Sequence, residues 1–422
     1  MLLKNTIFVL FLSVVIVSCN KNNVSIAPKD KNVINCTTEI RGGFDIGSGS
    51  TKLQIASVKV CENNEITIQK SYFKENANVQ YSAALIQDPH DPSKVILPDT
   101  IIADGYKVMA HLRDKALEKL AKDCGSSCFV SSWRGIMTAA FRKANNWQSA
   151  QNQLSKVVDG LIIKRLAQDE EALYGFYPVI KIKGIDLSNA VVWDMGGGST
   201  QITAFSPDFK ISADFTATGA KVIEMPVGSG TFENELKGSA TTFNPIDTKI
   251  NIATQYIKNN LEKDLAAKQE IKNDFSNLFV NGKKYYVIGG ILSRALPAIV
   301  KVTLKDFNLL SYAKIKDSAM INVISLADIS KNFNQVKTYS DAELKNYALD
   351  NKIMSKAELD DPKNASRYKS ISSNLLLTKT YMESDLSISD IYPVIIDGTD
   401  TLMISPKFSD EEYWKTDKLS AK

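Results

Sequence analysis

The chain contains one short pattern twice, and this repeat limits the fold more than any other feature. The stretch "FDIGSGSTKLQ" spans Phe44–Gln54, and "WDMGGGSTQIT" spans Trp193–Thr203. Both fit D-x-G-x-G-S-T, and their aspartates, Asp45 and Asp194, are 149 residues apart. Each copy lies between two stretches that are typical of buried strands. The repeat therefore predicts two related halves, each containing a β-hairpin with a glycine-rich turn.

Helical and strand patterns alternate along the chain and restart at the second copy. Tyr106–Lys122 has an apolar stripe at helical spacing, and we expect a short strand at Phe129–Ser132 followed by a helix over Gly135–Trp147. Leu161–Leu166 is strand-like and precedes another helix, and the hairpin at Ala190–Phe205 begins the series again. This order predicts two α/β domains.

The first residues are typical of an export signal. Lys4 precedes an apolar run, Ile7–Val17, which is too short to span a bilayer. The run ends in "IVSC", which resembles the bacterial lipobox, so we expect Cys19 to be lipidated and to become the mature N-terminus. The alternative is an ordinary signal peptide that ends near a cysteine. We expect a lipid-anchored protein facing the periplasm, and Asn20 after the cysteine favours the outer membrane.

Export places the other four cysteines in an oxidising compartment, where an even number favours disulfides. If a tight turn joins the strands around Gly47, residues whose numbers sum to 97 face each other across the first hairpin. Cys36 and Cys61 satisfy this register, which leaves Cys124 and Cys128 as a local pair. A zinc site is the competing interpretation, but the spacing does not fit and histidine partners are missing.

Composition excludes several classes of function. The 422-residue chain has a formal net charge of +4, too small to suggest binding to a nucleic-acid duplex. It has two histidines, which makes a histidine-rich metal site or a Ser-His-Asp triad improbable. Neither a Walker phosphate loop nor a G-x-S-x-G nucleophile elbow occurs.

Glycine-rich hairpin turns suit the binding of phosphate, because a turn without Cβ atoms lets an anion approach backbone N–H groups. The glycines that would supply these groups are Gly47, Gly49, Gly196, Gly197 and Gly198. The hydroxyl donors beside them are Ser48, Ser50, Thr51, Ser199 and Thr200. Asp45 and Asp194, facing each other, are expected to hold a Mg²⁺ ion, mainly through its waters.

The two hairpins resemble the phosphate loops of the actin-like ATPase and sugar-kinase superfamily. Within it, the chain resembles the exopolyphosphatase/guanosine-pentaphosphate phosphatase (Ppx/GppA) family from about Arg41 to Ile404. Besides the hairpins, the matching segments are "TAAFRKANN" (Thr138–Asn146), "QDEEALYGF" (Gln168–Phe176) and "VIGGILSRAL" (Val287–Leu296). The resemblance implies two related actin-like ATPase (ribonuclease H-like) domains with an active-site cleft between them.

The resemblance also implies roles for particular residues. Glu171 would be the catalytic residue and Arg142 a phosphate contact, and the glycine-rich loop at Gly289 and Gly290 would complete the substrate site. The expected organisation is a signal peptide (1–19), a tether (20–37), domain I (38–178), domain II (179–405) and a charged tail (406–422).

Three residues depart from the family's usual pattern. Gly49 replaces an asparagine, Gln168 a glycine, and Gln201 the glutamate that normally follows G-G-G-S-T. "STQI" instead resembles the apyrases, extracellular nucleoside triphosphate diphosphohydrolases of the same superfamily. In apyrases a serine, a glutamine and a glutamate position the attacking water, which implies that Ser199 and Gln201 act together with Glu171.

Three functions follow from these features. The first is an exported exopolyphosphatase that removes terminal phosphate from polyphosphate, and the second is an apyrase-like nucleotidase. The third is a phosphate-binding protein with a decayed site, which the presence of Asp45, Glu171 and Asp194 disfavours. The expected partners are the polyphosphate or nucleotide substrate and a membrane reached through the lipid anchor, and the sequence predicts no oligomeric state.

Overall fold

The structure used here is a computed structural model, and it describes most of the chain between residues 35 and 404. The described ranges are 35–62, 66–183, 189–211, 217–225, 227–228, 282–289, 323–350, 354–360, 370–383, 387–393 and 398–404, with single positions at 232, 251, 254, 255, 259 and 368. Cys19, Gly290, the predicted signal peptide and the predicted charged tail lie outside them. The first strand begins at Cys36, so the last two residues of the predicted tether are part of a sheet.

A five-stranded sheet carries the first hairpin. Its strands are β1 (Cys36–Ile46), β2 (Ser50–Cys61), β3 (Ile66–Asn78), β6 (Ser132–Met137) and β7 (Ile162–Arg165). They lie in the order β3-β2-β1-β6-β7, with β1, β2 and β3 antiparallel, and β1, β6 and β7 parallel. The last six residues of β1 are buried, which suits the central strand of a sheet covered on both faces.

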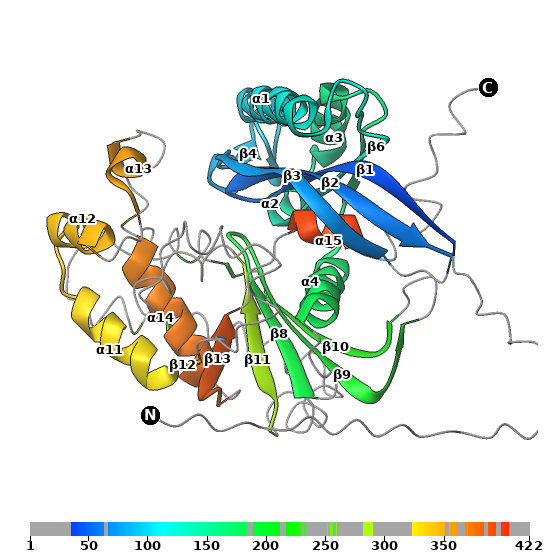
Figure 1. The fold of residues 1–422 in the computed structure, drawn as a ribbon. Helices are drawn as coiled ribbons and strands as arrows, with labels where there is room; N and C mark the ends of the chain where they lie inside the picture. Colours follow the sequence, from blue (N-terminus) through cyan, green and yellow to red (C-terminus); the bar gives the residue numbers. More distant parts are fainter. Residues whose placement is uncertain are drawn as a thin grey trace, which may run out of the picture. The chain divides into compact units, whose positions relative to one another are not determined.

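A six-stranded sheet carries the second hairpin and repeats this order. Its strands are β8 (Ala190–Met195), β9 (Thr200–Ile211), β10 (Ala217–Met225), β11 (Lys284–Ile288), β13 (Asp390–Pro393) and β12 (Ile324–Ser325). The order is β10-β9-β8-β11-β13-β12, and its first five strands have the same directions as those of the first sheet (Figure 1). The predicted duplication is therefore confirmed at the level of topology.

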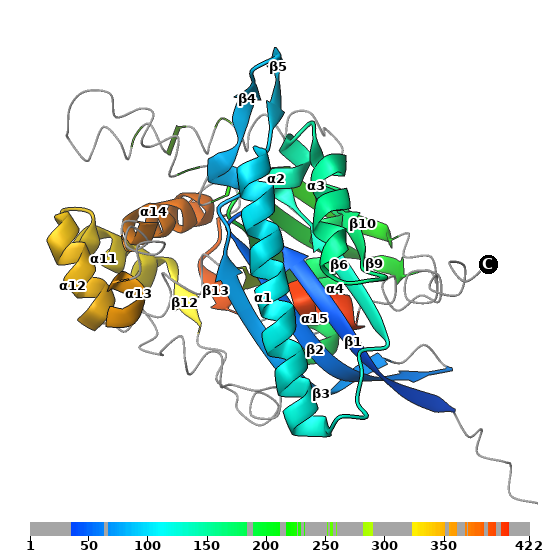
Figure 2. The same ribbon diagram turned by 90° about the horizontal axis from the view of Figure 1, so that it is seen from above.

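Each sheet has its own apolar core under a separate group of helices. Helices α1 (Asp99–Cys124), α2 (Ala139–Lys143) and α3 (Trp147–Leu154) pack with the first sheet. Helices α11 (Leu326–Val336), α12 (Asp341–Asp350), α13 (Lys356–Asp360) and α14 (Ser370–Glu383) pack with the second. The short strands β4 (Ile86–Asp88) and β5 (Asp91–Ile96) form a separate hairpin (Figure 2). No helix among the described residues is long and apolar enough to cross a membrane.

Two further helices connect the halves. Helix α4 (Gln168–Lys183) follows the last strand of the first sheet and packs against β8, β9 and β10 of the second. Helix α15 (Gly398–Ile404) follows the second sheet and packs against β1 and β2 of the first, where Met403 and Ile404 contact Ala56 and Val58. The two helices also contact each other.

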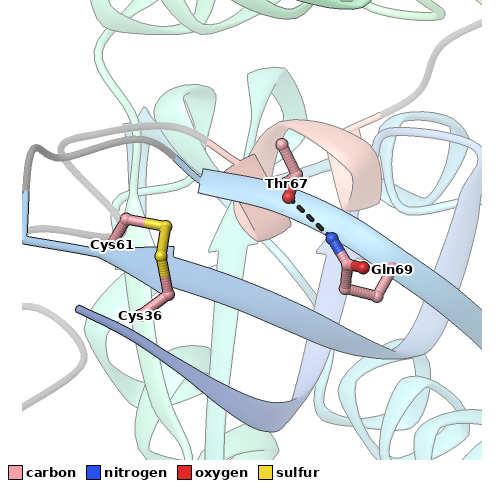
Figure 3. Close-up of a disulfide and its surroundings, with 4 residues drawn as sticks. All are labelled: Cys36, Cys61, Thr67 and Gln69. Atoms are coloured by element: carbon pink, nitrogen blue, oxygen red, sulfur yellow. Dashed lines mark hydrogen bonds between the residues drawn. A yellow bond between two sulfur atoms is a disulfide. The ribbon is translucent and has the colours of Figure 1, made fainter. Parts of the chain in front are cut away.

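The disulfide pairing predicted from the register is present. Every β1–β2 pair from Cys36↔Cys61 to Ile46↔Thr51 has residue numbers that sum to 97. Cys36 and Cys61 are bonded at the open end of this hairpin (Figure 3), and Cys124 is bonded to Cys128 after α1. Figure 3 also shows Gln69 donating to the Thr67 hydroxyl of β3 at 2.8 Å.

Two expected elements were wrong between residues 129 and 147. The strand is β6, Ser132–Met137, in which every residue is buried, whereas Phe129 is 74% exposed. Arg134 and Gly135 concealed it, because neither residue type is typical of a buried strand. The helix expected to follow is two helices, α2 and α3, separated where Asn145 and Asn146 accept hydrogen bonds from the backbone N–H groups of Val95 and Leu97.

Candidate active site

The two glycine-rich hairpins have the same turn. In the first, the N–H of Gly47 donates to the carbonyl of Ser50 at 2.9 Å. In the second, the N–H of Gly196 donates to the carbonyl of Ser199 at 3.0 Å. The repeated sequence therefore produces a repeated backbone arrangement, with Asp45 or Asp194 on the strand that enters each turn.

The tips of the two hairpins contact each other. A Cβ atom added to Gly198 would lie 2.7 Å from the Ser48 hydroxyl and 2.9 Å from the Cβ of Ala139 at the start of α2. Only glycine allows this approach. The Ser48 hydroxyl also accepts a hydrogen bond from the N–H of Ala140 at 3.2 Å, so it joins the first hairpin to α2.

Glu171, Arg142, Ser199 and Gln201 form one hydrogen-bonded group. An Nη1 hydrogen of Arg142 bonds Glu171 Oε2 at 2.5 Å, and Nη2 donates to Ser199 Oγ at 3.0 Å. The amide Nε2 of Gln201 donates to Ser199 Oγ at 2.9 Å and lies 3.4 Å from Glu171 Oε2. The four side chains come from α2, α4 and the second hairpin, and the structure brings all of them together.

This network leaves two catalytically useful groups available. Glu171 uses Oε2 for Arg142 and Gln201, and its Oε1 accepts no hydrogen bond from any described residue. Ser199 Oγ accepts two hydrogen bonds, so its own hydrogen points to a third partner. A base oxygen and a hydroxyl donor at one place suit the positioning of a water beside a phosphate.

Burial affects the basicity of Glu171. Its side chain is 18% exposed, and this burial raises the pKa of the carboxyl, while the charge and hydrogen bond of Arg142 lower the pKa. A carboxylate with a raised pKa is a stronger base. Arg142 is therefore an ion-pair partner of Glu171 in this structure, in addition to its predicted role as a phosphate contact.

Asp194 carries a negative charge that the protein does not compensate directly. It makes no side-chain hydrogen bond or ion pair with any described residue, whereas Asp45 bonds the Lys52 ammonium at 2.6 Å. Burial, followed by the neighbouring charge of Glu171, raises the pKa of Asp194 to about 7, and Asp45 adds to the rise.

These carboxylates fit a divalent cation. Hard divalent cations prefer carboxylate oxygens and stabilise such a surplus of negative charge. No group of three or more metal-ligating side chains occurs among the described residues. Two carboxylates alone would bind an ion that keeps several of its waters.

Two of the predicted phosphate-binding hydroxyls are in the wrong place for that role. Thr51 and Thr200 are fully buried, and the Thr200 hydroxyl donates to the carbonyl of Val227 at 2.6 Å. These threonines lie on the strands that leave the two turns, Thr51 in β2 and Thr200 in β9, and their side chains are enclosed by the protein. Ser50 remains half-buried at the turn of the first hairpin.

The glycine-rich loop after β11 lies beside Asp194. Gly289 has a φ of +107°, and a Cβ atom there would lie 2.4 Å from the carbonyl oxygen of Met195. A side chain at this position would be strained and would displace the strand that carries Asp194. Gly290, the other predicted residue of this loop, is outside the described residues.

Two lysines at the site were missed. Lys52 lies directly opposite Asp45, so the register with pairs summing to 97 could have found it. Lys143 directs its ammonium to the carbonyl of Gly198 at 3.4 Å, and no sequence signal distinguishes it from other lysines beside an arginine.

Known proteins resemble this chain in sequence pattern and in fold. Residues 105–276 match the model of the Ppx/GppA phosphatase family. The Ppx/GppA enzyme of Aquifex aeolicus has a similar fold, with a TM-score of 0.56 and 15% identity, covering 87% of this chain and 100% of that one. An exopolyphosphatase-like protein gives a TM-score of 0.61 at 15% identity over 91% of this chain and 99% of its own.

A third structure, an exopolyphosphatase from Cytophaga hutchinsonii, gives a TM-score of 0.55 at 13% identity, over 87% of this chain and 98% of its own. No curated protein matches the chain. At these identities the structural likeness establishes the fold.

The duplicated sheets and their paired phosphate hairpins define a protein of the actin-like ATPase fold with two related domains. The resemblance expected from the sequence is borne out over residues 105–276, which match the model of this family. This match covers less than half of the chain, and with the fold it supports a Ppx/GppA-like phosphatase, a hydrolase of phosphoanhydride bonds.

Proposed function

We propose that this phosphatase releases terminal phosphate from polyphosphate, with Mg²⁺ at Asp45 and Asp194. The observation that carries the proposal is the position of Glu171, whose Oε1 is available beside the Ser199 hydroxyl where the two hairpins meet. The magnesium ion would neutralise phosphate charge. The names of the structural neighbours support exopolyphosphatase activity over other hydrolyses.

In this proposal the protein's own residues position and activate the water. Glu171 Oε1 accepts a proton from the water as it attacks the terminal phosphorus, and Ser199 donates its hydrogen to the water or to a phosphate oxygen. Arg142 holds Oε2 of Glu171 in place, and Arg142 and Gln201 together hold Oγ of Ser199. The bond from phosphorus to the bridging oxygen breaks, and the shortened chain leaves with that oxygen.

A nucleoside tri- or diphosphatase is the second candidate, and Gln201 favours it. Its amide donates to Ser199 and lies within 3.4 Å of Glu171, an arrangement in which glutamate would instead place two carboxylates together. A third possibility, binding without turnover, is disfavoured because the base, its ion pair and both aspartates are present together.

One side-by-side assay tests these candidates. Phosphate release is measured from long-chain polyphosphate, tripolyphosphate, ATP and ADP, with Mg²⁺ and after chelation. We expect turnover of polyphosphate that chelation abolishes and Mg²⁺ restores. Faster release from ATP and ADP would establish the nucleotidase instead, and binding without release from any of the four would establish the decayed site.

Gln201→Glu distinguishes the two enzymes at the level of mechanism. A second carboxylate beside Glu171 would raise the pKa of Glu171 and repel phosphate. If the site follows the exopolyphosphatases, polyphosphate hydrolysis should be unchanged or increase. A fall in the turnover of all four substrates would indicate that Gln201 orients the water through its amide.

We further propose that the protein is an exported lipoprotein, anchored through Cys19 and facing the periplasm, with the outer membrane favoured by Asn20. The lipobox-like "IVSC" supports this, as do two disulfides that require an oxidising compartment. Cys19→Ser should prevent lipidation and move the protein out of the membrane fraction. Wild-type protein found free in the soluble fraction would contradict the anchor.

A further inference from the structure

Lys143 lies beside the tip of the second hairpin and takes no part in the catalytic group described above. It is the last residue of α2, and its ammonium contacts the carbonyl of Gly198 at 3.4 Å. Its side chain is exposed. A contact at 3.4 Å to a neutral oxygen is weak for an ammonium group, which has three hydrogens to donate.

Charge pairing separates Lys143 from the other cations of the site. Lys52 is paired with Asp45 at 2.6 Å, and Arg142 with Glu171 at 2.5 Å. Within the described part of the chain, Lys143 has no carboxylate partner, and its contact with Gly198 is its one hydrogen bond. It is therefore the cation of this site whose charge remains available to a bound anion.

Arg142 and Lys143 form a row along the second hairpin. Arg142 contacts Ser199, and the next residue, Lys143, contacts the preceding residue of the hairpin, Gly198. One step along α2 thus corresponds to one step along the hairpin. A phosphate beside Ser199 and Glu171 would have the next phosphate of its chain beside Gly198 and Lys143.

We propose that Lys143 binds the phosphate adjacent to the one that is attacked, which is the phosphate that leaves with the bridging oxygen. This assignment rests on the proposed function, because it takes the phosphate at Glu171 as the reacting one. It names the substrate class as a chain of at least two phosphates, with or without a nucleoside. The ammonium stabilises the negative charge that develops on the leaving oxygen.

The test compares Lys143→Gln and Lys143→Arg with Lys107→Gln, an exposed lysine of α1 that pairs with Asp104. We measure kcat/KM for tripolyphosphate and ATP, and the inhibition constant of orthophosphate. Lys143→Gln should lower kcat/KM by about 10- to 50-fold, the usual value of a charged hydrogen bond, and leave orthophosphate inhibition within twofold. Lys143→Arg should stay within about threefold of wild type, because it keeps the charge, and Lys107→Gln should be unchanged.

A second measurement separates this inference from the proposed function. Tripolyphosphate binding is measured by calorimetry in Glu171→Gln, with and without Lys143→Gln, where the lysine change should weaken binding about tenfold. Lys143-dependent binding in Glu171→Gln, together with a wild-type protein that releases no phosphate from any of the four substrates, would overturn the proposed function and support only the phosphate-binding part of the inference. Active wild type with unimpaired Lys143→Gln, or equal loss in Lys143→Gln and Lys143→Arg, would overturn the inference and leave the function standing.

Discussion

The hairpins β1–β2 and β8–β9 share a sequence pattern and a turn, but the residue opposite each aspartate differs. In the first hairpin Asp45 faces Lys52 and pairs with it at 2.6 Å. In the second, Asp194 faces Gln201, which bonds Ser199 and Glu171 instead. The first aspartate is thus compensated by its own hairpin, while burial and neighbouring carboxylates raise the pKa of the second to about 7.

This difference shows how two copies of one motif can take different roles, one structural and one catalytic. The first hairpin is closed by a disulfide, balanced in charge and joined to α2 by Ser48. The second supplies Ser199 and Gln201 to the group around Glu171. We infer that the first copy mainly holds the site together and that the second performs the chemistry.

The largest effect on turnover is expected when the proposed base, Glu171, is replaced. Glu171→Gln keeps the shape of the side chain and removes its proton acceptor, so kcat should fall by about 10²- to 10⁴-fold with little change in substrate affinity. Steady-state phosphate release measures this effect. Glu170→Gln is the matched control, because Glu170 pairs with Lys164 and should affect turnover less than threefold. Unimpaired turnover in Glu171→Gln would end its catalytic assignment.

Of the two disulfides, the one between Cys36 and Cys61 should contribute more to the free energy of unfolding. A bond between residues 25 apart in sequence limits the unfolded chain, and replacing Cys36 and Cys61 together by alanine should lower the free energy of unfolding by roughly 3 kcal/mol. Urea unfolding measures the change. The matched pair Cys124 and Cys128 closes a much shorter loop, so its replacement should cost less, and the reverse order would contradict the entropic explanation.

Equivalent glycines should respond differently in the two hairpins. Gly49 and Gly198 are both four residues after their aspartates, but a Cβ at Gly49 would meet its nearest atom, in the Gln80 side chain, at 3.6 Å. At Gly198 it would meet Ser48 at 2.7 Å. Gly198→Ala should destabilise the protein by about 1–3 kcal/mol, and Gly49→Ala by less than about 0.5 kcal/mol, as measured by urea unfolding. Equal effects would show that the tips do not remain in contact.

The smallest effect is expected when the first hairpin is made to resemble the second. Lys52→Gln leaves Asp45 without its cation and increases the negative charge near Glu171 and Asp194, so kcat/KM should fall by about tenfold. Asp45→Asn removes a proposed Mg²⁺ ligand and should lower kcat/KM by itself, but if the two residues act as a pair, the double variant should lose less than the two single losses combined. Additive losses in the double-mutant cycle would show that they act independently.

Much of this arrangement could be predicted because it depends on local rules. Pairing residues outward from the turn predicted the register of the first hairpin, and this register predicted both disulfides. The repeated glycine-rich pattern predicted the fold with two related domains. The segments near Glu171 and Arg142 were found by resemblance to a family, since acidic residues at a helix start are also explained by the helix dipole. Whether these residues act in catalysis remains a prediction.

Other features depend on contacts that no local pattern records. Thr200 has the sequence position of a phosphate ligand, but its hydroxyl points to Val227. Lys143 is significant only because Gly198, from the other sheet, lies beside it. The strand Ser132–Met137 was missed because tertiary burial outweighs the weak strand preference of arginine and glycine.

The position of α15 has a consequence for how the protein folds. The first sheet contains some of the earliest described residues of the chain, yet Met403 and Ile404 cover its Ala56 and Val58. Contacts across such a separation in sequence form slowly, because loop closure precedes the stabilisation they bring. Until α15 docks, this face of the first sheet stays open to water. Removal of residues 398–404 should therefore expose the apolar surface around Ala56 and Val58 of the first sheet. The exposed surface should promote aggregation during refolding.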